Sequence, residues 1–173
     1  MNTFNEIQRF RIRWAWVAAI VLNGIFIYAI VQQIFFGKPF GNKPAPNFVL
    51  VLLELFFLLL LFFIFSIRLQ TTYSTAGIQY RFFPFQLKKT TIEWHELSDA
   101  YIRESHSFYE YGGYGLRKGS PKTGNAINTS ESCRQGLQLR FEDGTLLLGT
   151  RNPAEIQKIL DIVIASGKIN RII

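Results

Sequence analysis

The side chains that could act as nucleophiles, bases or metal ligands are few and far apart in the sequence. Cys133 is the single cysteine, and the two histidines, His95 and His106, are eleven positions apart. Nucleophilic catalysis needs a serine or cysteine beside a histidine and an orienting acid, and no strand–turn–helix elbow supplies one. A single cysteine excludes an internal disulfide and a thiolate-rich metal site and suits a reducing cytoplasm. We therefore expect no enzyme activity, no cofactor and no metal.

A glycine-rich segment at 111–117 is the nearest approach to a phosphate-binding loop. It lacks the following Lys-Ser/Thr pair and the helix start that hold an anion. The residue types favour a glycine-dependent turn or bulge with tyrosines covering the sheet. The alternative is a protein-contact patch inside a tyrosine-rich surface around residues 108–117. Its candidate residues are Tyr111, Gly112, Gly113, Tyr114 and Arg117.

Glu54 is the one charged residue inside either of two long apolar runs. A carboxylate within a membrane helix costs about 2.5–3.5 kcal/mol on insertion scales, so it must face the partner helix or be protonated. Pairing the two runs about a turn near residue 42 puts Glu54 opposite Tyr28 and Gln32, with Gln33 as a further donor. Three interpretations stay open: a hydrogen-bonded clamp between the helices, a proton or ion site, and a contact to another membrane protein.

The two apolar runs predict a transmembrane helical hairpin over residues 14–67. The spans are 14–36, with no charge, and 48–67, and each is long enough to cross a hydrocarbon core of roughly 30 Å. The loop between them, 37–47, contains three prolines and two glycines, so it cannot continue a helix. The first run is longer than the core of a secretory signal and lacks a cleavage site, which favours a retained anchor.

Basic residues beside the two runs predict the orientation of the hairpin. These candidate contacts to the membrane surface are Arg9, Arg11, Arg13, Arg68, Lys88 and Lys89. The loop carries only Lys38 and Lys43, so the positive-inside rule favours a multi-pass protein of the inner membrane with both termini in the cytoplasm. Residues 1–13 are then a basic cytoplasmic N-terminus. The basic side chains can also lie against anionic headgroups.

Residues 68–173 alternate apolar and polar positions in short runs, which is typical of β-strands. We predict strands on either side of Ala76-Gly77, at 91–97, 100–103, 115–118 and 125–128, and on either side of Asp143-Gly144, a pair that favours a hairpin turn. Asn152 as a cap and Pro153 then open an amphipathic helix over 153–167. This part carries 14 Lys/Arg against 10 Asp/Glu, too mild an excess for a nucleic-acid binder.

Three motifs resemble those of bacterial pleckstrin-homology-like (PH-like) membrane proteins. They are Thr91-Ile-Glu-Trp-His-Glu-Leu97, the glycine-rich segment 111–117, and Gly136-Leu-Gln-Leu with Asp143-Gly144, Gly149-Thr150 and Pro153-Ala-Glu-Ile. The resemblance covers roughly residues 10–167. It implies a membrane α-helical hairpin followed by a mainly-β PH-like domain. That domain would have about seven antiparallel strands in a strongly bent sheet or barrel, with a C-terminal capping helix.

The functional expectation is a membrane protein whose cytoplasmic domain mediates assembly with itself or with a membrane-protein partner. The resemblance implies a cytoplasmic face and self-association, and the lipid bilayer is the other partner. An alternative from another class is sensing of anionic lipid or a small ligand at the membrane surface. A third is an auxiliary transport element that uses Glu54.

Overall fold

The computed structural model describes residues 3–10, 12–119, 124–129 and 133–169, which belong to two compact units. One unit, Ile12–Ser66, contains two long helices. The other combines Met1–Arg11 with Ile67–Ile173, so its chain comes from both sides of the helical unit. We call the described part of this second unit the β-domain.

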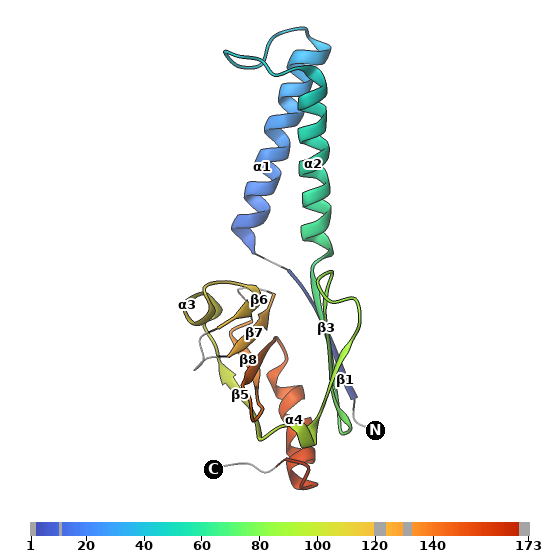
Figure 1. The fold of residues 1–173 in the computed structure, drawn as a ribbon, viewed down its shortest axis with the longest axis vertical. Coiled ribbons are helices and arrows are strands. Elements are labelled where there is room, and N and C mark those ends of the chain that lie inside the picture. The colour runs from blue at the N-terminus through green and yellow to red at the C-terminus, as the bar shows by residue number, and fades with distance from the viewer. Residues whose placement is uncertain (1–2, 11, 120–123, 130–132, 170–173) are drawn as a thin grey trace. The chain divides into compact units, whose positions relative to one another are not determined.

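The helical unit is an antiparallel pair made of α1 (Arg13–Ile30) and α2 (Asn47–Ser66) (Figure 1). A short π-helix, η1 (Val31–Phe35), extends α1. The rings of Phe26 and Phe57 stack between the helices with centroids 4.9 Å apart. Arg13–Phe35 has 23 residues and Asn47–Ser66 has 20, and both are long and apolar enough to cross a membrane by length and composition. The prediction of two long apolar helices is confirmed.

The first sheet of the β-domain has the strand order β1-β2-β3-β4, and all its pairs are antiparallel. Its strands are β1 (Thr3–Arg9), β2 (Arg68–Ser74), β3 (Gly77–Phe83) and β4 (Thr90–Glu93). The hydroxyl oxygen of Ser74 accepts the N–H groups of Ala76 and Gly77 in the predicted turn. A Cβ at Gly77 would lie 2.6 Å from the carbonyl oxygen of Ile92, so the close approach of β4 requires glycine.

The second sheet has the strand order β5-β8-β9-β7-β6. Its strands are β5 (Asp99–Glu104), β6 (Gly115–Lys118), β7 (Asn125–Asn128), β8 (Gln135–Arg140) and β9 (Thr145–Thr150). The pair β7–β9 is parallel, which corrects the expectation of antiparallel strands throughout. The reason is that the β6–β7 hairpin adds to the far side of β9, so β7 and β9 are not consecutive strands.

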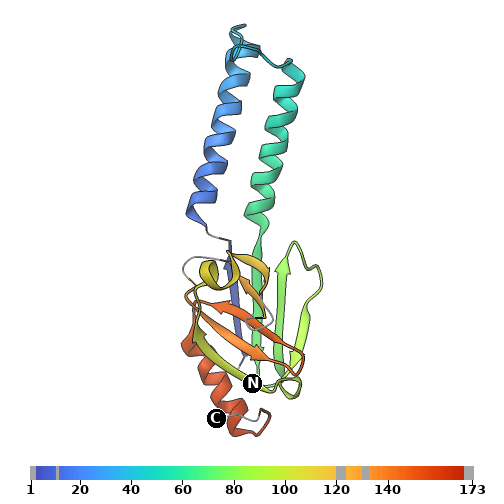
Figure 2. The ribbon, with the colours of Figure 1, turned by 60° about the vertical axis from the view of Figure 1, so that its left-hand side comes forward.

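Helix α4 (Pro153–Ala165) packs on the sheets through one apolar stripe and closes the core of the β-domain (Figure 2). Its buried residues, Ile156, Ile159, Leu160 and Val163, recur at the spacing that the sequence predicts. They join one cluster with side chains of both sheets, among them Leu69, Phe82, Leu137 and Leu148, and with Trp94, which directly follows β4. A mainly-β domain with a C-terminal helix is therefore confirmed.

The described strands form two open sheets. In each strand order the two end strands, β1 and β4 or β5 and β6, have no pairing that joins them. The barrel named as one form of the predicted fold is thus not observed. Two short helical segments also differ from expectation: η2 (Trp94–Glu96) replaces the second half of the strand predicted at 91–97, and α3 (Ser107–Tyr111) is not among the predicted elements.

Strand β1 is not predicted by the sequence analysis. It pairs with β2 along its whole length, from Thr3 opposite Ser74 to Arg9 opposite Arg68. Two of its three inward side chains, Glu6 and Gln8, are polar and buried, and the third, Phe4, packs against the core, whereas Ile7 is exposed. In this part of β1, polar residues face inward and an apolar residue faces outward, the reverse of a typical half-buried strand. The sequence pattern therefore predicts a polar, basic terminus here and not a strand.

Glu6 joins β1 to the start of helix α4. Its carboxylate accepts hydrogen bonds from the Thr150 hydroxyl (2.7 Å), the Arg151 backbone N–H (2.8 Å) and the Asn152 side-chain amide (3.3 Å). Asn152 holds the N-cap position, but its side chain makes no cap hydrogen bond to α4. The predicted cap is thus wrong in mechanism, because the Asn152 amide is used to bind Glu6.

Gln8 makes a second buried connection from β1 into the other sheet. Its amide Nε2 donates to the Gly149 carbonyl oxygen at 2.6 Å, and its Oε1 accepts from the Thr129 hydroxyl at 3.2 Å. The Cys133 thiol also donates to this Oε1, at 3.1 Å. Through Glu6 and Gln8, β1 therefore binds β9 and the loop that precedes β8 by side chains alone.

Candidate functional site

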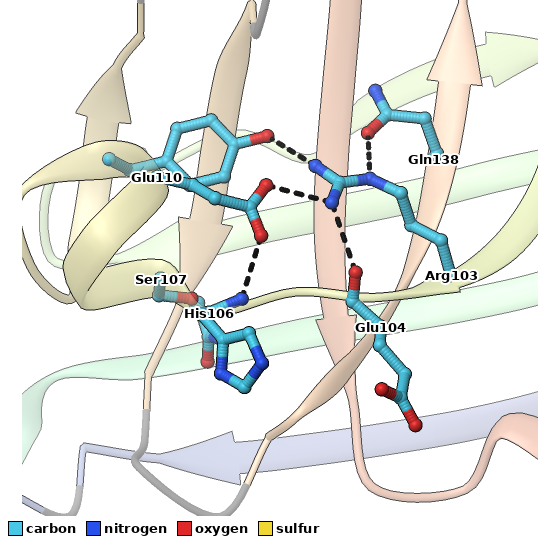
Figure 3. Close-up of polar contacts among 8 residues, drawn as sticks. Arg103, Glu104, His106, Ser107, Glu110 and Gln138 are labelled. Carbon is cyan, nitrogen blue, oxygen red and sulfur yellow. Dashed lines mark hydrogen bonds and ion pairs between the residues drawn. The ribbon is translucent and has the colours of Figure 1, made fainter.

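The site built around α3 is positioned by Arg103, which lies on β5 (Figure 3). One guanidinium nitrogen, Nη1, lies 2.7 Å from the Glu110 carboxylate and donates to the Glu104 carbonyl oxygen at 3.0 Å. Nη2 donates to the Tyr111 hydroxyl oxygen at 2.9 Å, and Nε donates to Gln138 Oε1 at 2.8 Å. One arginine therefore connects the short helix to strands β5 and β8.

The electrostatics of this cluster keep Glu110 ionised at neutral pH. Burial alone would raise the pKa of the Glu110 carboxyl, but the backbone N–H of His106 and the Arg103 guanidinium lower it below its ordinary value. The His106 N–H donates to Glu110 Oε1 at 2.8 Å. Glu110 thus binds both the first turn of α3 and the cation on β5.

The start of α3 is held by hydrogen bonds from Asn128 on β7. The Asn128 amide donates to the Ser107 hydroxyl oxygen at 2.5 Å and to the Cys133 carbonyl oxygen at 2.9 Å. Asn128 is buried, so its amide is available to these partners and not to solvent. A helix this short is not stable by itself, and these contacts explain why it forms.

The glycine-rich segment 111–117 forms a turn that depends on glycine, as one of its two interpretations predicts. Gly112 ends α3 in the left-handed region at φ 69°, and Gly113 follows at φ 141°. A Cβ on Gly113 would also lie 2.7 Å from a guanidinium nitrogen of Arg117. These glycines reverse the chain after α3 and lead it into β6.

The aromatic residues exposed in this region are not the expected ones. Tyr111 is buried, with 7% of its surface exposed, because its hydroxyl lies against Arg103; its expected exposure is wrong. Burial raises the pKa of Tyr111, which the Arg103 charge partly offsets. By contrast, Phe108 is 62% and Tyr109 is 87% exposed, and their rings meet edge to face at 5.8 Å.

We call this surface the α3 patch. It consists of Phe108, Tyr109, Tyr114, Leu116 and Arg117, of which Tyr114 is half-buried and the others are exposed. Beside it lies a depression of about 250 Å³, whose lining includes His106, Tyr114 and Arg134. Its aromatic and arginine content is typical of protein-binding surfaces.

Cys133 also lines this depression, but its thiol has low reactivity. Its side chain is buried, and burial raises the pKa of the thiol above its ordinary value, with Arg151 acting in the opposite direction. The thiolate, which is the reactive form, is therefore scarce at neutral pH. Among the described residues, no group of three or more His, Cys, Asp or Glu side chains could hold a metal ion.

The candidate membrane-surface residues fall in three places. Arg9 and Arg68 are register partners at the end of the β1–β2 pair, and Arg13 is the first residue of α1. Lys88 and Lys89 are exposed between β3 and β4. Arg11 lies outside the described residues. The structure thus places Arg9 and Arg68 together on the first sheet.

The intramembrane candidates do not meet as expected. Glu54 is buried on α2, and neither of its carboxylate oxygens has a hydrogen-bond partner among the described residues. The Gln32 amide donates instead to the Tyr28 hydroxyl oxygen at 3.1 Å, and the Gln33 amide donates to Ala45 and Asn47 beside the interhelical loop. The proposed donors are therefore used elsewhere, and a hydrogen-bonded clamp at Glu54 is not observed.

Replacing Glu54 with leucine is expected to raise the stability of the helix pair by about 1 kcal/mol, because a buried polar group without a partner opposes folding. Glu54→Gln should leave stability nearly unchanged. Thermal unfolding of the full chain in detergent measures both, with Gln32→Leu as a control on the other helix. A large loss in both Glu54 variants would restore the clamp. Loss of a proton- or ion-linked phenotype in Glu54→Gln alone would favour the transport interpretation.

Comparison with known proteins gives no family for this chain: no family model matches the sequence, and no curated protein matches it.

Proposed function

We propose that this chain is an integral membrane protein whose β-domain mediates protein–protein assembly in the cytoplasm. Helices α1 and α2 would cross the bilayer as a hairpin. Because β1 and β2 pair in one sheet, the chain enters and leaves the hairpin on the same side of the membrane. Arg9, Arg13 and Arg68 outweigh the two lysines of the interhelical loop, which favours the cytoplasmic side and the inner membrane of a bacterium.

The fold of the β-domain supports a PH-like assignment within this proposal. Two sheets share one core, and the C-terminal helix α4 covers it with a single apolar stripe. Two of the three motifs that resemble bacterial PH-like proteins contribute to this core: Trp94 of the first is buried, and the last runs from β8 through β9 to the start of α4. In the proposed protein, this domain is a scaffold that presents binding surfaces rather than a catalytic centre.

The exposure of Phe108 and Tyr109 is the observation that carries the assembly function. Two adjacent large side chains stay in solvent although the helix that bears them is held firmly by Arg103 and Asn128. Aromatic anchors on a rigid support bind a partner at little cost in conformational entropy. The expected partner is a second copy of the chain or another membrane protein.

A photo-crosslinking amino acid at Tyr109 of the full chain, in native membranes, is expected to give one discrete adduct. The same amino acid at Ile162, a half-exposed position on α4, is the matched control and should give none. Mass spectrometry of the adduct separates a second copy from another protein. Phe108→Ala combined with Tyr109→Ala should weaken co-purification of that partner by more than about tenfold.

The absence of an adduct at Tyr109, or a partner that still binds the double variant, would contradict the α3 patch as the interface. Alkaline extraction tests the proposed membrane location separately, because an integral membrane protein stays in the membrane fraction after this treatment.

A further inference from the structure

The loop between β3 and β4, residues 84–89, displays apolar and basic side chains together. Phe85 is 58% exposed and Leu87 is 73% exposed, and they are followed at once by exposed Lys88 and Lys89. Exposing large apolar side chains to water at the tip of a loop has an unfavourable free energy. Their exposure therefore points to an apolar environment outside the β-domain.

The conformation of this loop is held by its own contacts. The Gln86 backbone N–H donates to the Phe82 carbonyl oxygen at 2.7 Å, and Gln86 Oε1 accepts from the Phe82 N–H at 3.2 Å. Arg81 donates to the Leu87 carbonyl oxygen at 3.3 Å, and the ring of Phe85 stacks on Phe82 at 5.3 Å. Because these contacts preorganise the loop, its tip loses little conformational entropy on binding.

The register of the first sheet places this loop at one defined end. Arg9 lies opposite Arg68, and Arg68 lies opposite Phe83, the last residue of β3. At this same end the Phe10 N–H donates to the Ile67 carbonyl oxygen at 3.1 Å. Ile67 is the single residue between α2 and β2. The loop thus projects from the end of the sheet where the chain passes to and from the helices.

The charge at this end is of one sign. No Asp or Glu occurs between Arg68 and Ile92 in the sequence. The guanidinium groups of Arg68 and Arg81 lie 5.2 and 5.8 Å from the ring centroid of Phe83. Arg9 and Arg68 lie at this end of the sheet, and Lys88 and Lys89 directly follow the apolar tip in the sequence, a composition that complements anionic headgroups.

We propose that the 84–89 loop inserts Phe85 and Leu87 into the interfacial layer of the anionic bilayer that the hairpin crosses, with Lys88 and Lys89 at the lipid phosphates. This inference rests on the proposed membrane anchoring. A bilayer fits better than a protein partner because lysine is depleted at protein interfaces, whereas an apolar tip next to lysines suits the headgroup region.

The test uses the full chain with Leu87→Cys carrying an environment-sensitive fluorophore, reconstituted in nanodiscs. One set contains phosphatidylcholine alone, and the other contains phosphatidylcholine with phosphatidylglycerol. We expect a blue-shifted emission, quenched by lipid-borne nitroxide, in the anionic discs. Replacing Lys88 and Lys89 with glutamine should lower the ratio of inserted to water-exposed label by about fivefold per lysine. The matched control is Glu142→Cys, labelled on the exposed β8–β9 turn.

A label at position 87 that stays water-like in anionic discs would overturn the insertion, and equal quenching in both lipids would overturn the role of anionic charge. Alkaline extraction of the same preparations separates this failure from failure of the anchoring itself. If the chain stays embedded while the label remains in water, only the loop inference fails. If the chain is extracted, the anchoring and the insertion fail together.

Discussion

Replacing Glu6 with alanine is expected to lower the free energy of unfolding of the β-domain by about 3 kcal/mol, because the change leaves hydrogen-bond donors of Thr150, Arg151 and Asn152 without their acceptor. For a domain of this size the melting temperature should fall by roughly 10 °C. Thermal unfolding of the full chain in detergent, followed by tryptophan fluorescence, measures the shift.

Asn5→Ala is the matched control, since Asn5 is exposed on the same strand and its loss should change the melting temperature little. Hydrogen exchange locates the effect: the Glu6→Ala variant should lose protection in β1 and in the first turn of α4. Unchanged protection in both places would mean that β1 contributes only its backbone pairing to the β-domain.

Replacing Arg103 with alanine is expected to destabilise α3 by about 2 kcal/mol, a value reduced for the partial solvent exposure of the Arg103–Glu110 pair. The change removes the cation beside Glu110 and the donor to the Tyr111 hydroxyl and to Gln138. Amide exchange across residues 106–113 should accelerate about 30-fold, while β8 and β9 keep their protection. The adduct at Tyr109 should weaken with it, because Phe108 and Tyr109 lose their rigid support.

Two variants bracket the Arg103 result. Lys118→Ala changes an exposed basic residue on β6 and should leave exchange in α3 unaltered. Arg103→Lys keeps the charge but not the planar fork, so it should recover the contact to Glu110 only in part. If α3 keeps its full protection in Arg103→Ala, Asn128 and the glycine turn alone hold the helix.

Sequence patterning predicted the elements whose inward faces are apolar. Ile78 and Phe82 mark β3, Leu137 and Leu139 mark β8, and the stripe of α4 marks the last helix. Strand β1 is not predicted because two of its three inward residues, Glu6 and Gln8, are polar and form hydrogen bonds with Thr150 and Gly149, far along the chain. Buried hydrogen-bond partners of this kind depend on the tertiary fold, which alternation of apolar residues does not encode.

The candidate site was predicted in location but not in detail. The glycines of 111–117 indicated a turn, and residues 108–117 contain the exposed aromatic pair. The burial of Tyr111 is not predictable from local sequence, because its partner Arg103 lies on strand β5 and Tyr111 on helix α3. A signal for the 84–89 loop was present in the sequence, since Phe85 and Leu87 directly precede two lysines, but apolar residues near a strand end also suit a core.

The position of the hairpin between β1 and β2 has a consequence for biosynthesis. The ribosome makes β1 first, then both helices, and only afterwards the strand that β1 pairs with. In a chain that inserts into the membrane as it is made, the first sheet therefore cannot assemble until α2 has left the ribosome. In the proposed membrane protein, a nascent chain stalled in the interhelical loop therefore has β1 without its pairing partner β2, as an unpaired strand open to quality control.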